Sequence, residues 1–164
     1  MELQTIYITK KDIQGIFRET NWQLHIVIDP GYVTRVGDEV IQAQLREFNY
    51  RLCKRLLHRR FAKFPLKDRI HWVGFPDGIR DAGTRHAHLL MHIPPSVSMG
   101  TDFQRLKVKS RLQSEWLRVS DRYDPYFLWA RWIDGCADNW AVATYVSREL
   151  TPRLWELEEL WFSQ

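Results

Sequence analysis

The sequence predicts an α+β domain in which helices flank a central, largely antiparallel sheet of about five strands. Two observations lead to this fold class. Short segments with alternating apolar and polar residues occur in neighbouring pairs separated by Pro- and Gly-rich turns, as in hairpins. Longer segments with helical apolar spacing lie among them, without the regular strand–helix alternation of a parallel sheet. A chain of 164 residues is long enough for one core, so we expect a single domain over residues 1–164.

The first strand is expected at Trp22–Asp29, because its apolar residues alternate and a Pro-Gly turn follows. The segment before it, around Ile6 and Tyr7, is ambiguous. A long helix is expected from about Glu39 to Ala62, where apolar residues recur at helical spacing and Arg and Lys fill the other face. Pro65 is expected to end this helix.

Two further strands are expected at Ile70–Phe75 and Arg85–Ile93, since each is closed by a Pro-containing turn. A second helix is expected at Asp102–Val119, with Thr101 as its N-cap. The buried side of this helix is predicted from its large apolar residues, Phe103, Leu106 and Trp116.

An aromatic-rich strand is expected at Tyr126–Ile133, and a third helix at Asp138–Leu150. Thr151-Pro152 is typical of the cap and first position of a closing helix, which would run through Trp161. The sequence contains no internal repeat and no convincing linker, which agrees with a single domain.

The composition favours a soluble protein that binds a polyanion. The formal net charge is +4, and the aromatic residues exceed the needs of a minimal core, so some are candidates for base stacking. Cys53 and Cys136 lack a metal-binding spacing and indicate two reduced thiols in a cytoplasmic protein. We expect no membrane partner, because we find no signal-peptide pattern and no apolar run long enough to span a bilayer.

The strand at Arg85–Ile93 carries the most informative pattern. Its alternation separates two sets of residues, His86, His88, Leu90 and His92 on one face and Ala87, Leu89, Met91 and Ile93 on the other. The second set is apolar and is expected to face the core. Two histidines roughly 6–7 Å apart on one strand face can converge on a single ion. Imidazoles suit Mn and Zn, and they support Mg only with added oxygen ligands. The alternative is a pair of polar residues at a strand edge.

The helix at Asp138–Leu150 carries Tyr145 and Arg148, which are spaced i, i+3 and therefore share a helix face. A tyrosine that attacks a phosphate at neutral pH needs a nearby cation or metal, because the phenol pKa is about 10. Arg148 can neutralise a phosphate, but it is a poor proton shuttle because it stays protonated. The alternative is a packed tyrosine beside a solvated arginine.

Taken together, the two motifs resemble those of a known family. His86-Ala87-His88 is similar to the hydrophobe-flanked HUH motif of rolling-circle replication initiators, the Rep proteins of the HUH endonuclease superfamily. Tyr145-Val146-Ser147-Arg148 is similar to their Tyr-x-x-Lys motif. The segment Asn21–Asp29 loosely resembles their first strand motif, and the whole resemblance spans roughly Trp22 to Leu150.

Two positions depart from the family pattern. Arg148 stands where the family usually has lysine, which keeps the charge but weakens any proton exchange with Tyr145, and Ala87 is small for the middle position of its motif. In this family a third metal ligand, often acidic, precedes the histidines on the neighbouring strand. Asp77 is the first choice for this ligand and His71 the second. The alternative for Asp77 is a residue of a Pro-Asp-Gly turn.

The resemblance implies an HUH/Rep nickase-like fold and a single-tyrosine endonuclease that nicks and joins single-stranded DNA at the start of rolling-circle replication. His86, His88 and Asp77 would hold a divalent metal, Mn or Mg, that polarises the scissile phosphate. Tyr145, assisted by Arg148, would attack in line and form a covalent 5′-phosphotyrosine with a free 3′-hydroxyl. The implied substrate is an origin hairpin in a prokaryotic, plasmid or phage context.

Basic residues on the first two long helices are candidates for phosphate contacts, with a solvated helix face as the alternative. These candidates are Arg51, Arg55, Arg59, Lys107 and Lys109. The chain contains no Gly-x-x-x-x-Gly-Lys-Ser/Thr motif, so a separate helicase would have to unwind the substrate.

Three other functions remain open. A single-tyrosine HUH transposase of insertion sequences is the nearest, because the segment Leu89–Ser98 resembles that group as well; it would use the same chemistry on transposon ends. A non-catalytic module for single-stranded nucleic acid would bind DNA without forming an adduct. A metal-dependent hydrolase that uses water would cleave DNA without trapping it.

Overall fold

The fold is that of a computed structural model, and the structure describes residues 10–29, 38–57, 60–77, 86–97, 100–120, 127–146 and 161–162. Four antiparallel strands form its sheet: β1 (Leu24–Asp29), β2 (His71–Asp77), β3 (His86–His92) and β4 (Phe127–Trp132). Their order is β4-β1-β3-β2, and the two-residue strand β5 (Trp161–Phe162) pairs with the outer edge of β2. The α+β class and the antiparallel sheet are confirmed, but the sheet has four strands of ordinary length rather than about five.

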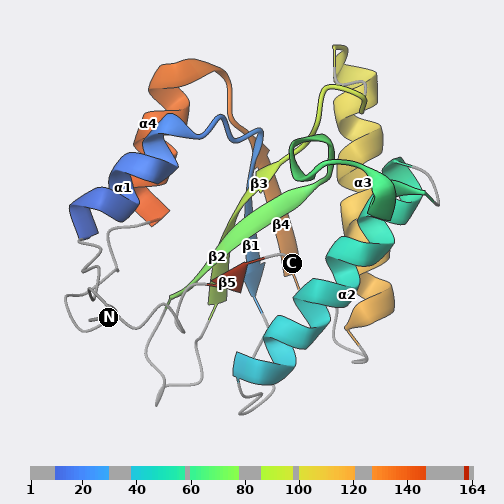
Figure 1. Cartoon of the computed structure of the whole chain (residues 1–164). Helices are drawn as coiled ribbons and strands as arrows, with labels where there is room; N and C mark the ends of the chain where they lie inside the picture. Colours follow the sequence, from blue (N-terminus) through green and yellow to red (C-terminus); the bar gives the residue numbers. More distant parts are fainter. Residues whose placement is uncertain are drawn as a thin grey trace, which may run out of the picture.

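Four α-helices accompany the sheet in the described residues: α1 (Lys10–Glu19), α2 (Asp38–Leu56), α3 (Asp102–Val119) and α4 (Gly135–Val146). From β1 to β4 the order is strand–helix–strand–strand–helix–strand, which is the ferredoxin-like arrangement (Figure 1). β1 and β3 occupy the centre of the sheet and are hydrogen-bonded neighbours. None of the helices in this part of the chain combines the length and apolarity that a membrane span requires.

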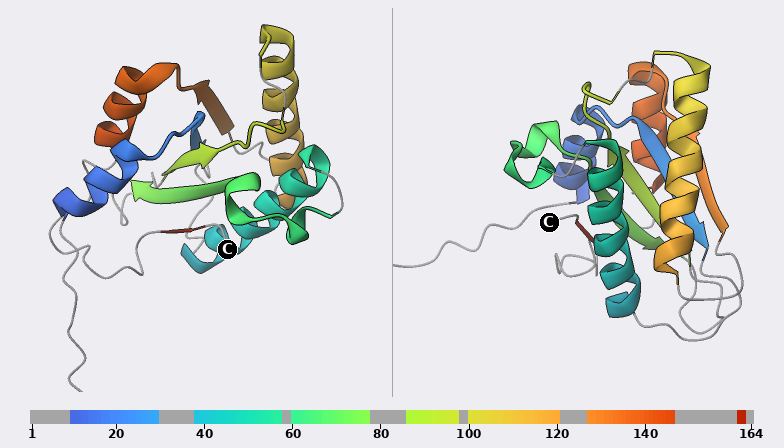
Figure 2. Two further views of the ribbon diagram at one scale, coloured as in Figure 1. Left: turned by 45° about the horizontal axis from the view of Figure 1, so that its top comes forward. Right: turned by 90° about the vertical axis from the view of Figure 1, so that its right-hand side faces the viewer.

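α2 and α3 cover one face of the sheet (Figures 1 and 2). The strand residues on this face are buried and apolar, and they alternate along each strand: Leu24, Ile26, Ile28, Ala87, Leu89, Met91, Leu128 and Ala130. Phe48 of α2 and Trp116 of α3 meet in an edge-to-face contact above them, with ring centroids 5.6 Å apart. The predicted core face of β3 is therefore confirmed.

α1 and α4 pack against the opposite face (Figure 1). A smaller buried cluster joins them to the sheet: Phe17, Trp22, Val73, Leu90, Ile133, Val142, Ala143 and Val146. The sequence does not predict α1, because Gly15 in its centre weakens the helical signal. This helix nevertheless matters for the site, because it fixes α4.

The side chain of Asn139 fastens α4 to the end of α1. Its oxygen accepts a hydrogen bond from the backbone N–H of Trp22, and its nitrogen donates to the carbonyl oxygens of Arg18 and Thr20. Asn139 is buried, so a smaller side chain at this position would remove these three hydrogen bonds to the backbone.

We therefore expect Asn139→Ala to lower the free energy of unfolding by about 2–3 kcal/mol, since buried polar groups are left unsatisfied. Urea denaturation followed by circular dichroism measures this change. Asn21→Ala is the matched control, because Asn21 is exposed and is expected to change stability little. Equal effects of the two substitutions would contradict the structural role of Asn139.

α2 ends at Leu56, so the prediction of one helix to Ala62 with Pro65 as its stop is wrong. Two 3₁₀ turns follow, at Phe61–Lys63 and Leu66–Asp68. The guanidinium of Arg69 donates to the carbonyl oxygens of Ala62 and Phe64, which fixes the non-helical path.

α3 has the predicted bounds, with a capping box between Thr101 and Gln104. The prediction of its buried side is wrong for two residues, since Phe103 is 75% and Leu106 is 65% exposed, whereas Trp116 is buried. At about 100° per residue, both lie roughly 140–160° round the helix from the buried Val108.

α4 begins at Gly135, three residues before the predicted start, and Gly135 has a φ of 83° that favours glycine. The predicted helical residues 147–150 lie outside the described residues, as do Ile6, Tyr7 and the closing helix up to residue 160. Trp161, the predicted end of the closing helix, belongs instead to β5. The other strand bounds differ from prediction by one or two residues.

The two cysteines have different environments. Cys53 of α2 is buried in the core between α2, α3 and the sheet, and this burial raises the pKa of its thiol to about 11. Cys136 is exposed at the start of α4. Because the thiolate is the reactive form, we expect a disulfide reagent at pH 8 to titrate one thiol in the native protein and two after denaturation. Fast reaction of both thiols in the native protein would contradict this packing.

Candidate functional site

A cavity of about 410 Å³ lies on the α4 face of the sheet. Its lining comes from β1, β3, β4 and α4: His25, Val27, His88, Trp129, Arg131, Asp138, Ala141, Val142 and Tyr145. The strand order explains this gathering, because β1 lies between β3 and β4. Val27 is directly opposite both His88 and Trp129, and His25 is opposite Arg131. Residues distant in sequence therefore share one surface.

His25 and His88 are in direct contact. His25 Nε2 and His88 Nδ1 are 2.9 Å apart, and the two rings stack with an interplanar angle of 18°. The residues are only 6% and 4% exposed. Burial lowers the pKa of His25 to about 4, with smaller contributions from His88 and Arg131, so the His25 ring is neutral at pH 7. One nitrogen of the contact donates and the other accepts.

Tyr145 covers this histidine pair from α4. Its ring meets His88 edge to face, with centroids 5.6 Å apart, and His25 at 6.3 Å. The helix is held in place on either side of Tyr145 by Val142 and Val146, which are buried against the sheet. Tyr145 itself is 44% exposed, so its aromatic ring is accessible both to the cavity and to solvent.

An ion pair forms another part of the cavity wall. The guanidinium of Arg131 donates to Asp138 Oδ1, and the backbone N–H of Asp134 donates to Asp138 Oδ2 at 3.0 Å. The Asp134 N–H and the Arg131 charge hold the pKa of Asp138 below its usual value. This carboxylate therefore stays ionised at neutral pH and keeps Arg131 at the cavity. Trp129 lies beside them and meets His25 edge to face.

Two of the predicted catalytic and metal residues, His88 and Tyr145, come together in the cavity. The backbone of His86 lies two residues before His88 on β3, and the backbone of Asp77 is directly opposite His86. The side chains of His86 and Asp77, and all of Arg148, lie outside what the structure describes. Among the described residues, no group of three or more His, Cys, Asp or Glu side chains is placed to hold a metal ion.

His71, the second choice for a third ligand, lies too far from His88. It is directly opposite His92, and the two rings stack with centroids 4.6 Å apart. His92 is four residues from His88, roughly 13 Å along the strand, which is beyond the reach of one shared ion.

The predicted nucleic-acid residues do not line this cavity. Arg51 and Arg55 line a separate groove between α2 and α3, on the other face of the sheet. Lys107 is exposed on α3 and Lys109 is half-buried there, and neither lines the groove. Arg59 lies outside the described residues.

Sequence reasoning did not identify His25, Trp129 or Arg131 as site residues. The alternation of β1 carries a usable signal for His25, because Leu24 and Ile26 face the core and His25 must face the other way. The missing information is the pairing of β1 with β3, which places His25 diagonally opposite His88.

Two imidazoles, an arginine, a carboxylate and a tyrosine thus line one cavity on the α4 face. Comparison of the chain with models of protein families, with curated proteins and with solved structures finds no match.

Proposed function

We propose that this protein is a metal-dependent, HUH-type endonuclease that nicks and rejoins single-stranded DNA through Tyr145. One observation carries the proposal: the Tyr145 ring lies against His88, 5.6 Å between centroids, in a solvent-open cavity. His88 belongs to the His-x-His motif and Tyr145 to the Tyr-x-x-Arg motif, which are more than fifty residues apart in the sequence. An exposed tyrosine above buried imidazoles is not required for core packing, and it suits attack on a bound phosphate.

The histidine pair fits a divalent metal ion. Histidines that bind metals usually donate their second ring N–H to a nearby acceptor, which fixes the tautomer and the ring orientation. The contact between His88 Nδ1 and His25 Nε2 supplies such an arrangement, with a neutral His25 as the acceptor and His88 Nε2 left to carry a lone pair. We assign His88, His86 and Asp77 to the metal and His25 to the positioning of His88. Bound there, Mn or Mg supplies positive charge to the scissile phosphate.

The reaction is a transesterification. The phenol oxygen of Tyr145 forms a bond to phosphorus while the bond from phosphorus to the 3′-oxygen breaks, and the phenol proton passes to solvent at the exposed side of the ring. The leaving oxygen takes a proton and becomes a free 3′-hydroxyl, and the 5′-phosphate stays on the protein. The number of phosphodiester bonds is conserved, so a returning 3′-hydroxyl reverses the step and joins the strand.

Arg131 is the charged residue of the cavity best suited to the phosphate oxygens. Its guanidinium presents several donors in a planar fork, and the pairing with Asp138 restricts its orientation. We propose that Arg131 contacts a non-bridging oxygen and stabilises the charge that develops there. Arg148, which lies outside the described residues, is proposed for the same role on the basis of the Tyr-x-x-Arg motif.

His25 provides a test of the metal assignment. We expect His25→Ala to weaken metal binding by about 10–100-fold, the usual effect of removing a group that orients a ligand. The measurement is the Mn concentration that gives half-maximal adduct formation, supported by calorimetric titration with Mn alone. His25→Gln, which can still accept a hydrogen bond, should recover part of the affinity, whereas equal loss in both variants or no loss in either would argue against a positioning role.

The proposed function is tested with a pool of labelled single-stranded DNA and Mn, followed by a denaturing gel. A protein band that carries covalent DNA, and that disappears with EDTA, supports the proposal. Cleavage without a shifted band would indicate a hydrolase that uses water. DNA binding with neither adduct nor cleavage would indicate a binding module. The sequences recovered from the adduct separate an origin hairpin from transposon ends.

A further inference from the structure

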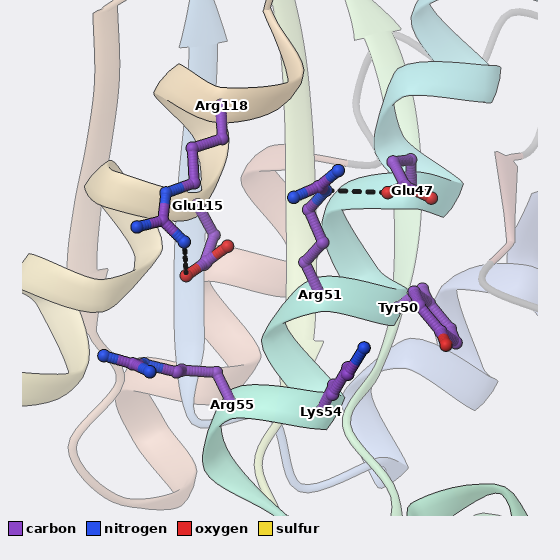
Figure 3. A pocket seen from close by; sticks show the side chains of 7 residues that line it. All are labelled: Glu47, Tyr50, Arg51, Lys54, Arg55, Glu115 and Arg118. Atoms are coloured by element: carbon purple, nitrogen blue, oxygen red, sulfur yellow. Dashed lines mark hydrogen bonds and ion pairs between the residues drawn. The ribbon is translucent and has the colours of Figure 1, made fainter. Parts of the chain in front are cut away.

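We propose that the groove between α2 and α3 binds the sugar–phosphate backbone of a DNA segment other than the one that is cut. The groove has a volume of about 360 Å³. Its lining residues come from both helices: Glu47, Tyr50, Arg51, Lys54, Arg55, Glu115 and Arg118 (Figure 3). The inference rests on the proposed function to the extent that DNA is the substrate.

The charges of the groove favour an anion. Four of its lining residues are cations and two are carboxylates, so an excess of positive charge remains. Arg51 pairs with Glu47 at 2.7 Å, and Arg118 pairs with Glu115 at 3.3 Å. Among the described residues that line the groove, no ion pair joins Lys54 or Arg55 to another residue. These two cations are exposed and are the main candidates for phosphate contacts.

The groove also contains positioned groups rather than only mobile surface charges. Glu115 is buried and holds the guanidinium of Arg118. Tyr50 is half exposed, and its ring is fixed edge to face by Phe61, with the ammonium of Lys54 5.8 Å from its centroid. In Figure 3 the Arg55 side chain extends from α2 toward the α3 side. Fixed guanidinium groups suit phosphate oxygens, and an exposed aromatic ring suits a base or sugar.

The groove and the Tyr145 cavity lie on opposite faces of the sheet. α2 and α3 cover one face of the sheet, and α4 lies on the other (Figures 1 and 2). The first face carries Leu24 and Leu89, and the second carries His88, against which Tyr145 packs. The sheet and the Phe48–Trp116 core separate the two sites. A strand held in the cavity must therefore pass round an edge of the sheet before another part of it can reach the groove. Only long DNA is expected to occupy both sites.

The test compares the double variant Lys54→Gln/Arg55→Gln with Lys63→Gln/Lys67→Gln, which removes the same charge from exposed residues outside the groove. Fluorescence anisotropy measures the binding of a long hairpin DNA, and of the shortest single strand that the unaltered protein binds, at several salt concentrations. For the long DNA, loss of two phosphate contacts should reduce the slope of log K against log salt by about 1.8 in the groove variant and not in the control. Affinity for the short strand should change equally in both variants.

Equal slopes in the two variants would overturn the inference, because net charge alone would then explain binding. A similar loss for short and long DNA in the groove variant would also overturn it, because both sites would hold the same segment. Thermal unfolding of each variant checks that the fold is retained. Anisotropy measures DNA binding and does not depend on adduct formation. The result therefore tests the groove even if the protein does not nick DNA.

Discussion

Tyr145→Phe is expected to abolish the covalent protein–DNA adduct, with a loss on the order of 10³-fold or more in the rate of its formation. The substitution removes only the hydroxyl group that forms the bond to phosphorus. The ring that packs edge to face on His88 remains, so the cavity should keep its shape. Binding of single-stranded DNA should therefore change little, and the defect should appear in the chemical step.

The measurement is the time course of adduct formation on a denaturing gel, with anisotropy as the measure of binding. Tyr123→Phe is the control for the chemical change, because it removes the same hydroxyl group from a tyrosine to which no role in the site is assigned. An adduct that persists in Tyr145→Phe at an undiminished rate would exclude Tyr145 as the nucleophile.

His88→Ala should weaken Mn binding by more than the roughly 10–100-fold expected for His25→Ala, because it removes a proposed metal ligand rather than a residue that orients one. Adduct formation should fall with the loss of bound metal. The His25 ring would also lose the partner that lies 2.9 Å from its Nε2. Because His88 is buried, part of the defect can come from lower stability, and thermal unfolding measured without metal separates the two effects.

His92→Ala is the matched control for this substitution. His92 lies on the same strand as His88, but it stacks on His71 and does not line the cavity. We expect it to leave the Mn dependence of adduct formation unchanged. If His88→Ala and His92→Ala gave the same Mn dependence, the assignment of His88 to the metal would be wrong.

Much of the fold could be predicted because its signals are local. The alternation of β3 separates Leu89 and Met91 from His88 without knowledge of the neighbouring strands. Thr101 and Gln104 mark the start of α3 through a capping box that is complete within four residues. Such patterns depend only on strand pleat and helix pitch.

Other features depend on tertiary contacts. Phe103 and Leu106 have apolar side chains at helical spacing, but the buried side of α3 is fixed by its packing on α2 and the sheet, not by the helix alone. α1 is stabilised by Trp22, whose indole N–H donates to the carbonyl of Phe17, and by Asn139 of α4. The contact with Asn139 joins residues more than a hundred positions apart in the sequence, so it cannot be read from local patterns.

Only part of the candidate site could be predicted from the sequence. The proximity of His88 and Tyr145 was expected only from the resemblance of their two motifs to a family, because helical and strand periodicity do not place α4 over β3. His25 required the register of β1 against β3, and Arg131 required the register of β1 against β4. Both arise from the ferredoxin-like strand order rather than from any motif.

The most direct test of the central claim, that Tyr145 forms a covalent bond to DNA, is mass spectrometry of the purified adduct after nuclease and trypsin digestion. The tryptic peptide from Trp132 to Arg148 contains one tyrosine, Tyr145. We predict that this peptide carries the mass of a nucleotide and that fragmentation places the added mass on Tyr145. An adduct whose nucleotide maps to another residue, or an active preparation that yields only the unmodified peptide, would contradict the account.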